Sequence, residues 1–174
     1  MQGNAELFRA LGEIDPKQPY GTSLFDALAR LTVSVAIEAV CLRDGYHKDT
    51  GPGFTKAFTE VHLVQRSLTD TAYPGQWHCP GSIMRPGESV EDVMKRLSER
   101  EFAGKILSYR FIENFNHPTE ARGHFFSLLY LCHLQEGECL WGKWFSVHDL
   151  PEKTVGHHRS EVIPRVARNY PLYK

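Results

Sequence analysis

The residues best able to do chemistry lie between Gly81 and Glu101, where a glycine-containing loop runs into a helix. Such a loop can bring backbone N–H groups at a helix N-terminus close to an anion such as a phosphate. Glu88 lies in the loop and Arg96 follows eight residues later, so the carboxylate could brace the arginine two turns along the helix. Glu101 follows Leu97 by four residues, which places both on one face of a regular helix. Taken one at a time, these charges are typical of a solvated helix surface, so their meaning depends on the whole pattern.

The elements that must position these residues alternate between strands and helices. Apolar residues with a period of two predict one strand over residues 31–39 and another over residues 61–66. Ser89 and Asp92 have the spacing of a capping box, and apolar residues at helical spacing extend this helix to about Phe102. The other expected elements are strands at residues 75–81, 125–134 and 143–147, a last helix at residues 161–168, and short helical stretches within residues 6–11 and 26–30. This order predicts a mixed α/β domain.

The composition limits the class of protein but says little about its function. With 174 residues, 41% of them hydrophobic and 24% charged, the chain is expected to form one soluble globular domain. The formal net charge of -1 gives no basic field for nucleic acid, and no apolar run approaches the length of a membrane span. The cysteines form no C-x-x-C pair and are expected to be reduced, structural residues of a cytoplasmic protein: Cys41, Cys79, Cys132 and Cys139.

Residues 81–104 resemble the Nudix box, whose pattern is G-x5-E-x7-R-E-U-x-E-E-x-G-U with U aliphatic. The matching positions are Pro80-Gly81-Ser82, Gly87-Glu88 and Arg96. Trp77 before the loop and residues 144–151 after it also look like landmarks that flank the box in that family. The resemblance covers roughly residues 31–150.

This resemblance implies an α/β protein with the Nudix fold, a mixed β-sheet sandwiched between helices (α/β/α). It implies a single Nudix domain over residues 1–174. Within it, residues 1–30 are expected to form an N-terminal extension, and residues 80–104 the Nudix-box loop and helix.

Two of the three metal-binding glutamates of the Nudix box are replaced in this chain. The first falls at Leu97 and the second at Arg100, whereas the third is kept as Glu101. Ser82 also stands where the box has its second glycine. Mg²⁺ needs hard oxygen ligands, which a leucine cannot supply, and an arginine would repel the ion. A cluster of two or three metal ions is therefore not expected.

The same replacements look like those of the Nudix-type GDP-mannose mannosyl hydrolases, which also lack glutamate at these two positions. This resemblance implies one Mg²⁺ ion, with Mn²⁺ as the alternative, held by the Gly81 carbonyl, Glu101 and Glu138. It implies that Arg66 binds the leaving group and that cleavage at the sugar carbon releases a nucleoside diphosphate. Arg96 is expected to contact phosphate or brace the site, so the expected catalytic residues are Glu101, Glu138 and Arg96.

The general base is left open by this resemblance. The histidine that serves as base in that branch falls at Cys139, and its loop arginine falls at Ile83. A thiol near neutral pH is not a comparable base. Arg100 either points to solvent or binds a phosphate in place of the lost metal. The bases that could replace the missing histidine are Glu138, His78, His124, His157 and His158.

Three functions remain open on the sequence alone. The first is Mg²⁺-dependent hydrolysis of a nucleoside diphosphate linked to another group, most simply a nucleotide sugar. The second is a degenerate Nudix domain that binds a phosphorylated nucleotide without turnover, with Arg100 standing where a metal would be. The third is an interaction domain with a vestigial pocket, whose partner surface would involve the aromatic-rich residues 111–130; these are otherwise core strand and loop. A small-molecule nucleotide is the expected ligand, neither nucleic acid nor membrane is expected, and a homodimer stays open.

Overall fold

In the computed structural model, which describes residues 2–16, 18, 19, 21–46, 57–135 and 141–173, a mixed seven-stranded sheet forms the centre of the fold. Its strands are β1 (Val33–Tyr46), β2 (Ala57–Gln65), β3 (Trp77–His78), β4 (Gly81–Ile83), β5 (Ile106–Glu120), β6 (Gly123–Leu134) and β7 (Lys143–Ser146). The main path is β3–β2–β1–β6–β5, with β4 paired to β1 and β7 paired to β2. The pair β1–β6 is parallel and the other pairs are antiparallel, which makes the sheet mixed.

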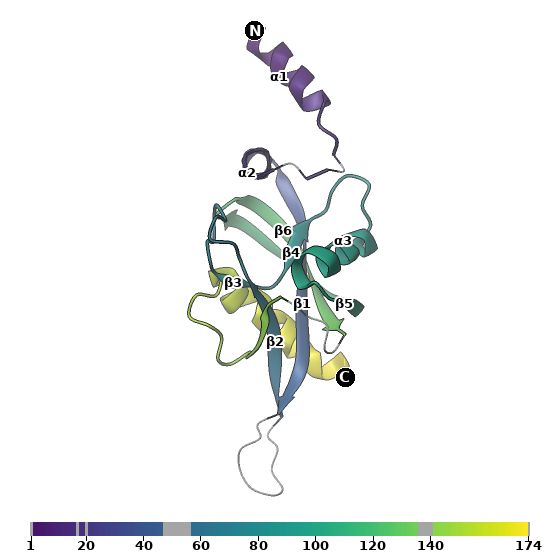
Figure 1. The fold of residues 1–174 in the computed structure, drawn as a ribbon, viewed down its shortest axis with the longest axis vertical. Helices are drawn as coiled ribbons and strands as arrows, with labels where there is room; N and C mark the ends of the chain where they lie inside the picture. The colour runs from purple at the N-terminus through teal and green to yellow at the C-terminus, as the bar shows by residue number, and fades with distance from the viewer. Residues whose placement is uncertain (1, 17, 20, 47–56, 136–140, 174) are drawn as a thin grey trace, which may run out of the picture.

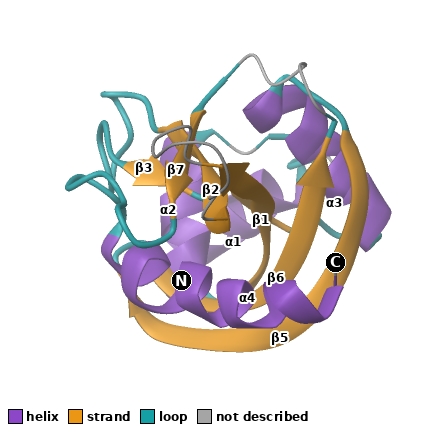
Figure 2. Cartoon of the chain, turned by 90° about the horizontal axis from the view of Figure 1, so that it is seen from below, coloured by secondary structure: helices purple, strands orange, loops and turns teal. Residues whose placement is uncertain are grey.

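Helices cover both faces of this sheet (Figure 2). The helices are α1 (Gln2–Gly12), α2 (Thr22–Leu31), α3 (Val90–Leu97) with the π-helical segment η1 (Ser98–Phe102), the π-helical segment η2 (His158–Val162), α4 (Ile163–Asn169) and the 3₁₀ turn η3 (Tyr170–Tyr173). Along β1, Ile37 and Ala39 pack in the cluster under α3, whereas Val40 and Leu42 pack in the cluster under α4. A strand buried on both faces is therefore the centre of an α/β/α sandwich, and the expected fold is confirmed.

The helix after the loop begins as expected and ends differently. The Ser89 hydroxyl accepts a hydrogen bond from the Asp92 backbone N–H, and the Asp92 carboxylate accepts one from the Ser89 N–H, so the capping box is present. After Leu97 the helix widens into the π-helical segment η1, and Phe102 joins Leu97 in the buried cluster. The regular helical turn expected between Leu97 and Glu101 is therefore a wider π-helical turn, in which Leu97 and Phe102 are buried and Glu101 is partly buried.

The sequence pattern does not predict the long strand β5. This strand lies at the edge of the sheet, where it exposes Leu107, Tyr109 and Phe111. It also contains Pro118, and its pairing with β6 is interrupted by register shifts. Edge strands tolerate proline and bulges because one side of their backbone needs no partner, so the alternating signal is weak there.

The first 31 residues form two helices with different roles. Helix α1 extends away from the sheet (Figure 1), with Leu7 and Phe8 exposed, whereas α2 packs on β6 and β1. The contact is close, because a Cβ at Gly123, which begins β6, would lie 2.0 Å from the Ala29 carbonyl oxygen. The expected N-terminal extension thus includes one helix that is docked on the domain.

Replacing Gly123 by alanine is expected to destabilise the fold by about 1–3 kcal/mol, since the new Cβ meets backbone and the φ of 152° disfavours L side chains. Urea unfolding followed by circular dichroism measures the loss. Gly156→Ala is the control, because a Cβ there meets nothing within 4 Å. Equal stability of the two variants would contradict the docking of α2 on this turn.

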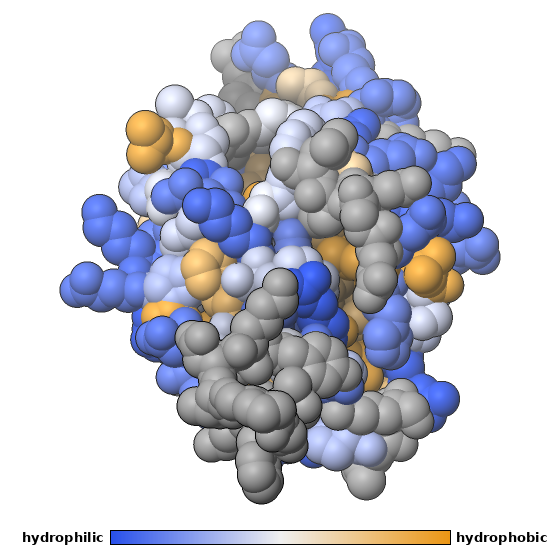
Figure 3. Space-filling model, turned by 60° about the horizontal axis from the view of Figure 1, so that its bottom comes forward, coloured by the Kyte–Doolittle hydropathy of each residue, from blue (hydrophilic) through white to orange (hydrophobic). Residues whose placement is uncertain are grey.

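Three of the four cysteines are buried in the structure. Cys41, Cys79 and Cys132 are buried in the core clusters, whereas Cys139 lies outside the described residues. No helix in the described part of the chain is both long and apolar enough to cross a bilayer. On the face drawn in Figure 3, hydrophilic residues predominate and apolar residues form separate small patches.

Candidate functional site

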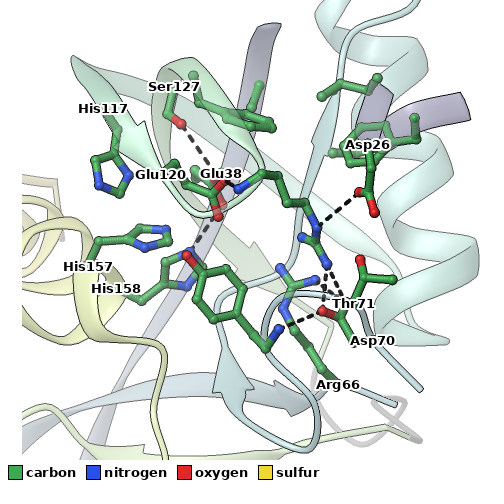
Figure 4. Close-up of a pocket in the computed structure, with 18 of the residues that line it drawn as sticks. Asp26, Glu38, Arg66, Asp70, Thr71, His117, Glu120, Ser127, His157 and His158 are labelled. Atoms are coloured by element: carbon green, nitrogen blue, oxygen red, sulfur yellow. Dashed lines mark hydrogen bonds and ion pairs between the residues drawn. The ribbon is translucent and has the colours of Figure 1, made fainter. Parts of the chain in front are cut away.

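A cavity of about 520 Å³ opens beside Gly81 and is lined by side chains from distant parts of the chain. Its walls come from α2, β1, β4, the β2–β3 loop, the β5–β6 hairpin and the segment before α4. Figure 4 shows the histidines on one side of Glu38, and Asp26 and Asp70 on the other. The cavity therefore has a histidine end and an α2 end, with a carboxyl group between them.

Glu38 is at the centre because of its place in the sheet. It lies on β1 between β4 and β6, in register with Gly81 on one side and Leu129 on the other. A Cβ at residue 81 would lie 2.2 Å from Glu38 Oε2, so the carboxyl group packs directly on the glycine backbone. The glycine that the sequence marks as a loop residue is thus also required by the close approach of this carboxyl group.

Burial raises the pKa of Glu38 to about 7. The positive charge of Arg66 and the Ser127 hydroxyl act in the opposite direction, and the hydroxyl donates to Oε1 over 3.4 Å. A carboxyl group with this pKa can both accept and release a proton near neutral pH, which is the property a general base needs.

His158 lies behind Glu38 with its tautomer fixed by the backbone. The Cys79 N–H donates to Nδ1 over 2.9 Å, so in the neutral ring the proton is on Nε2. That nitrogen lies 3.8 Å from Glu38 Oε2. Burial, followed by the neighbouring histidines and Arg66, lowers the pKa of His158 well below its usual value. His158 therefore faces Glu38 as a neutral ring with its N–H toward the carboxyl group.

Two further histidines continue from His158 along the cavity wall. The His157 ring centroid lies 4.5 Å from that of His158, and the His117 centroid lies 4.6 Å from that of His157. Burial lowers the pKa of His157 to about 4, and the charges of His117 and Arg66 add to this effect. His157 and His158 are thus neutral at pH 7, so they can form hydrogen bonds here but supply no positive charge.

Two of the arginines that line the cavity share Asp70. Arg66 Nη1 donates to Asp70 over 3.1 Å, and Arg122 Nη2 donates to its two carboxylate oxygens over 2.6 and 2.7 Å. Burial alone would raise the pKa of Asp70, but backbone N–H groups and the two arginines outweigh it and lower that pKa. Arg66 Nε is a buried donor with no hydrogen-bond partner in the described part of the chain. A buried donor without a partner is costly unless water or a ligand supplies the acceptor.

Arg96 holds the loop that enters α3. Its Nε and Nη2 donate to the two carboxylate oxygens of Glu88 over 3.1 and 2.7 Å. Nη2 also donates to the Ile83 carbonyl over 3.1 Å, and Nη1 donates to the Ser82 hydroxyl. The serine that replaces a glycine of the Nudix box thus gives Arg96 a partner that glycine lacks. These contacts brace the loop, while a role of Arg96 in catalysis stays a prediction.

The structure brings together only some of the residues expected at the site. Gly81, Arg66, His157 and His158 line the cavity. Ile83 also lines it, where the related branch has its loop arginine. The candidates absent from its walls are Glu101, Arg100, His78 and His124. Glu138 and Cys139 lie outside the described residues.

Arg100 and Glu101 differ in their surroundings although they are neighbours. Arg100 is exposed on η1 and does not line the cavity, so the structure gives no support to its expected contact with a phosphate. Glu101 is partly buried, and burial raises its pKa against the charges of Arg66, Arg96 and Arg100. Glu101 is thus close enough to Arg66 to respond to the same charge as Glu38.

Glu38 is the functional candidate that sequence reasoning missed. The strand pattern drew attention to the apolar residues of β1, and Glu38 is the single charge within residues 31–42. A lone carboxyl group in a strand that is apolar on both sides is costly to bury unless it has a role or a partner. This cost was the signal available in the sequence.

The described residues do not by themselves complete a metal site. No group of three or more His, Cys, Asp or Glu side chains in the described part of the chain is placed to hold a metal ion. Leu97 is 1% exposed within an apolar cluster, so its position offers no ligand. The expected site of Gly81, Glu101 and Glu138 stays a prediction, because Glu138 lies outside the described residues.

A family model described as the NUDIX domain matches residues 53–166 of the chain. This range includes the braced loop, η1 and most of the cavity walls, but neither α2 nor Glu38. Comparison with curated protein sequences gives no match.

Solved structures share the fold at low sequence identity. A MutT NUDIX hydrolase from Burkholderia pseudomallei has a TM-score of 0.60 and 22% identity, covering 78% of this chain and 98% of that one. The NUDIX domain of Shewanella oneidensis NrtR, crystallised with ADP ribose, has a TM-score of 0.57 and 20% identity, covering 94% and 97%. NrtR from the same organism in complex with a 27mer DNA has a TM-score of 0.59 and 19% identity, covering 79% of this chain but only 62% of that one. At these identities the likeness is one of fold.

Proposed function

The chain belongs to the NUDIX domain family, and from this premise we propose that it hydrolyses a nucleoside diphosphate linked to a second group, with Glu38 as the general base. The observation that carries the proposal is the Glu38 carboxyl group, with a pKa of about 7, in the cavity beside Gly81. A base works best when its pKa lies near the working pH. Family members generally use divalent metal ions, and the dependence on Mg²⁺ is part of the test below.

The charges of the cavity suggest where the diphosphate lies. His157 and His158 are neutral at pH 7, so a phosphate gains little from them. Arg66 has a buried N–H with no partner in the described part of the chain, and its charge reaches Glu38. A guanidinium N–H to a phosphate oxygen is a strong, charge-assisted hydrogen bond. We place the diphosphate beside Arg66, with one of its two linked groups toward each end of the cavity.

The reaction then needs one proton transfer, to the Glu38 carboxylate. Ionised Glu38 takes a proton from a water molecule as the water oxygen bonds to the sugar carbon or to phosphorus. The bond from that atom to the leaving oxygen breaks, and the electron pair stays on the leaving phosphate. Arg66 stabilises the negative charge that develops on this leaving group. Attack at carbon gives a nucleoside diphosphate, as the likeness to the GDP-mannose branch suggests, whereas attack at phosphorus gives a nucleoside monophosphate.

The test is product analysis on a panel of substrates. The purified chain is incubated with GDP-mannose, UDP-glucose and ADP-ribose, with Mg²⁺, with Mn²⁺ and with a chelator, and the products are separated by chromatography. We expect a nucleoside diphosphate and a free sugar from at least one substrate, with loss of turnover in the chelator and in Glu101→Gln. A nucleoside monophosphate would overturn attack at carbon while keeping hydrolysis. No turnover of any substrate would overturn the proposal.

The second candidate is a domain that binds a nucleotide without turnover. The burial of Leu97 and the lack of a complete metal site among the described residues favour it. The sequence suggests Arg100 as the residue that takes the place of the metal in such a domain. Arg100 is, however, exposed and is not part of the cavity walls. Binding would instead depend on Arg66 and Arg122, both of which already pair with Asp70. Nucleotide affinity that is unchanged by a chelator, without hydrolysis, would favour this candidate.

A further inference from the structure

Helix α2 contributes to the wall of the cavity although it precedes the part of the chain that the family model matches. Phe25 and Asp26 line the α2 end of the cavity, and both come from this helix. The helix is held in place by Ala29, which is 2% exposed and meets the Gly123 backbone. The cavity end that α2 forms is therefore a feature of this chain beyond the matched residues 53–166.

Arg122 ties α2 to the rest of the cavity. Its guanidinium carbon lies 5.9 Å from the Phe25 ring centroid and 5.8 Å from that of Tyr73. The same group pairs with Asp70 in the β2–β3 loop, and its Nε lies 4.0 Å from Asp26 Oδ1. One arginine of the β5–β6 turn thus fixes the positions of an aromatic ring and a carboxylate on α2.

Asp26 has an oxygen that the surrounding residues do not satisfy. Its Oδ1 is buried and accepts no hydrogen bond within the described part of the chain, since 4.0 Å from Arg122 Nε is too long for one. The neighbouring carboxylates have partners. Asp70 accepts hydrogen bonds from two arginines and two backbone N–H groups. Glu120 accepts them from the Arg122 backbone N–H and the Tyr73 hydroxyl. A buried acceptor without a donor is costly unless a ligand or water supplies the donor.

We propose that α2 forms a specificity subsite, in which Asp26 Oδ1 accepts a hydrogen bond from a ring-shaped group of the ligand and Phe25 contacts that ring. The ligand group must carry an N–H or O–H donor on a flat or saturated ring. An amino-bearing nucleobase and a hydroxylated sugar both have this chemistry. This inference rests on the proposed function, because it assumes that the substrate occupies the cavity.

The position of the subsite relative to Glu38 indicates which part of the substrate it would bind. Figure 4 places Asp26 and the histidines on opposite sides of Glu38. A substrate with two different groups joined by a diphosphate would put one group at each end and the scissile bond near the base. The α2 end would then select one of the two groups without taking part in the proton transfer.

The test measures binding by calorimetry on the full chain, in the presence of Mg²⁺. The probes are GDP, IDP, GDP-mannose and inorganic pyrophosphate, and the variants are Asp26→Asn and Phe25→Leu. We expect Asp26→Asn to weaken binding of the selected probe about 10- to 100-fold, since it replaces a charged acceptor with a neutral amide oxygen. Phe25→Leu is expected to weaken it about three- to tenfold, and pyrophosphate binding should be unchanged in both. Asp149→Asn, which alters an exposed carboxylate, is the matched control.

The pattern across the probes identifies the donor. If the donor is the amino group of a guanine base, Asp26→Asn weakens GDP binding more than IDP binding. If the donor is a sugar hydroxyl, it weakens GDP-mannose binding and leaves GDP unchanged. Equal affinities of Asp26→Asn and wild type for every probe would overturn the proposal, and so would a wild-type chain that binds none of them.

The same experiment separates this inference from the proposed function. Binding does not depend on turnover, so Glu38→Gln should still show the effect of Asp26→Asn. Normal hydrolysis by Glu38→Gln would show that Glu38 is not the general base, without contradicting the subsite on α2. Selective binding without any hydrolysis would favour the nucleotide-binding candidate, with the same subsite.

Discussion

Glu38→Gln is expected to lower kcat by about 10²- to 10⁴-fold, while the affinity for the substrate changes by less than about threefold. Glutamine keeps the size of the side chain beside Gly81 and its contact with Ser127, but it cannot accept a proton. Steady-state kinetics on the best substrate of the panel gives kcat, and calorimetry gives the affinity. The matched control is Glu152→Gln, which alters an exposed carboxylate.

The pH dependence of the reaction provides a second readout of the same residue. A base acts only in its deprotonated form, and the pKa of Glu38 is raised by burial to about 7. We therefore expect kcat/KM to be constant above about pH 8 and to fall about tenfold for each pH unit below about 6. The residual activity of Glu38→Gln should lack this inflection. A wild-type inflection near the ordinary glutamate pKa, or an unchanged profile in the variant, would show that another group is the base.

Arg96→Ala is expected to reduce the free energy of unfolding by about 2–4 kcal/mol, because it leaves a partly buried carboxylate without its partner. The Arg96 and Glu88 side chains are 14% and 18% exposed, and Arg96 also loses its bonds to Ser82 and Ile83. Burial alone would raise the pKa of Glu88, but the Arg96 contacts and the Arg85 N–H outweigh it and lower that pKa. The stabilisation from this pair is therefore present above the unfolded pKa of glutamate and lost as pH falls through the lowered folded value.

Urea unfolding at pH 7 and at lower pH measures both effects. Lys95→Ala on the same helix is the control, since Lys95 is exposed. The difference between wild type and Arg96→Ala should shrink as Glu88 becomes protonated. A loss below about 0.5 kcal/mol at pH 7, the size of an ordinary surface substitution, would mean that the loop does not depend on this arginine.

Some of the N-terminal residues contribute to the wall of the cavity. The sequence presents residues 1–30 as an extension, and α1 indeed extends away from the sheet (Figure 1). Helix α2 instead lines the cavity with Phe25 and Asp26. A truncation that removes this extension would therefore remove part of the candidate site along with α1.

The sequence by itself determined the local features of this protein. The capping box of Ser89 and Asp92 and the pairing of Glu88 with Arg96 both lie within one loop and helix. Their partners are three and eight residues apart, so the local turn from the loop into the helix brings them together without any distant strand. The family resemblance rests on the same short segment, and for this reason the fold could be predicted although two metal-binding glutamates are missing.

Only the tertiary structure decided which groups face one another across the cavity. Glu38 meets Gly81 and His158 because β1 lies beside β4 and under the segment that precedes α4. Asp26 approaches Arg122 because α2 packs on the β5–β6 turn. These partners are 43 to 120 residues apart in the chain, so no spacing rule joins them. Sheet register and burial do, and burial is also what raises the pKa of Glu38 into the range of a general base.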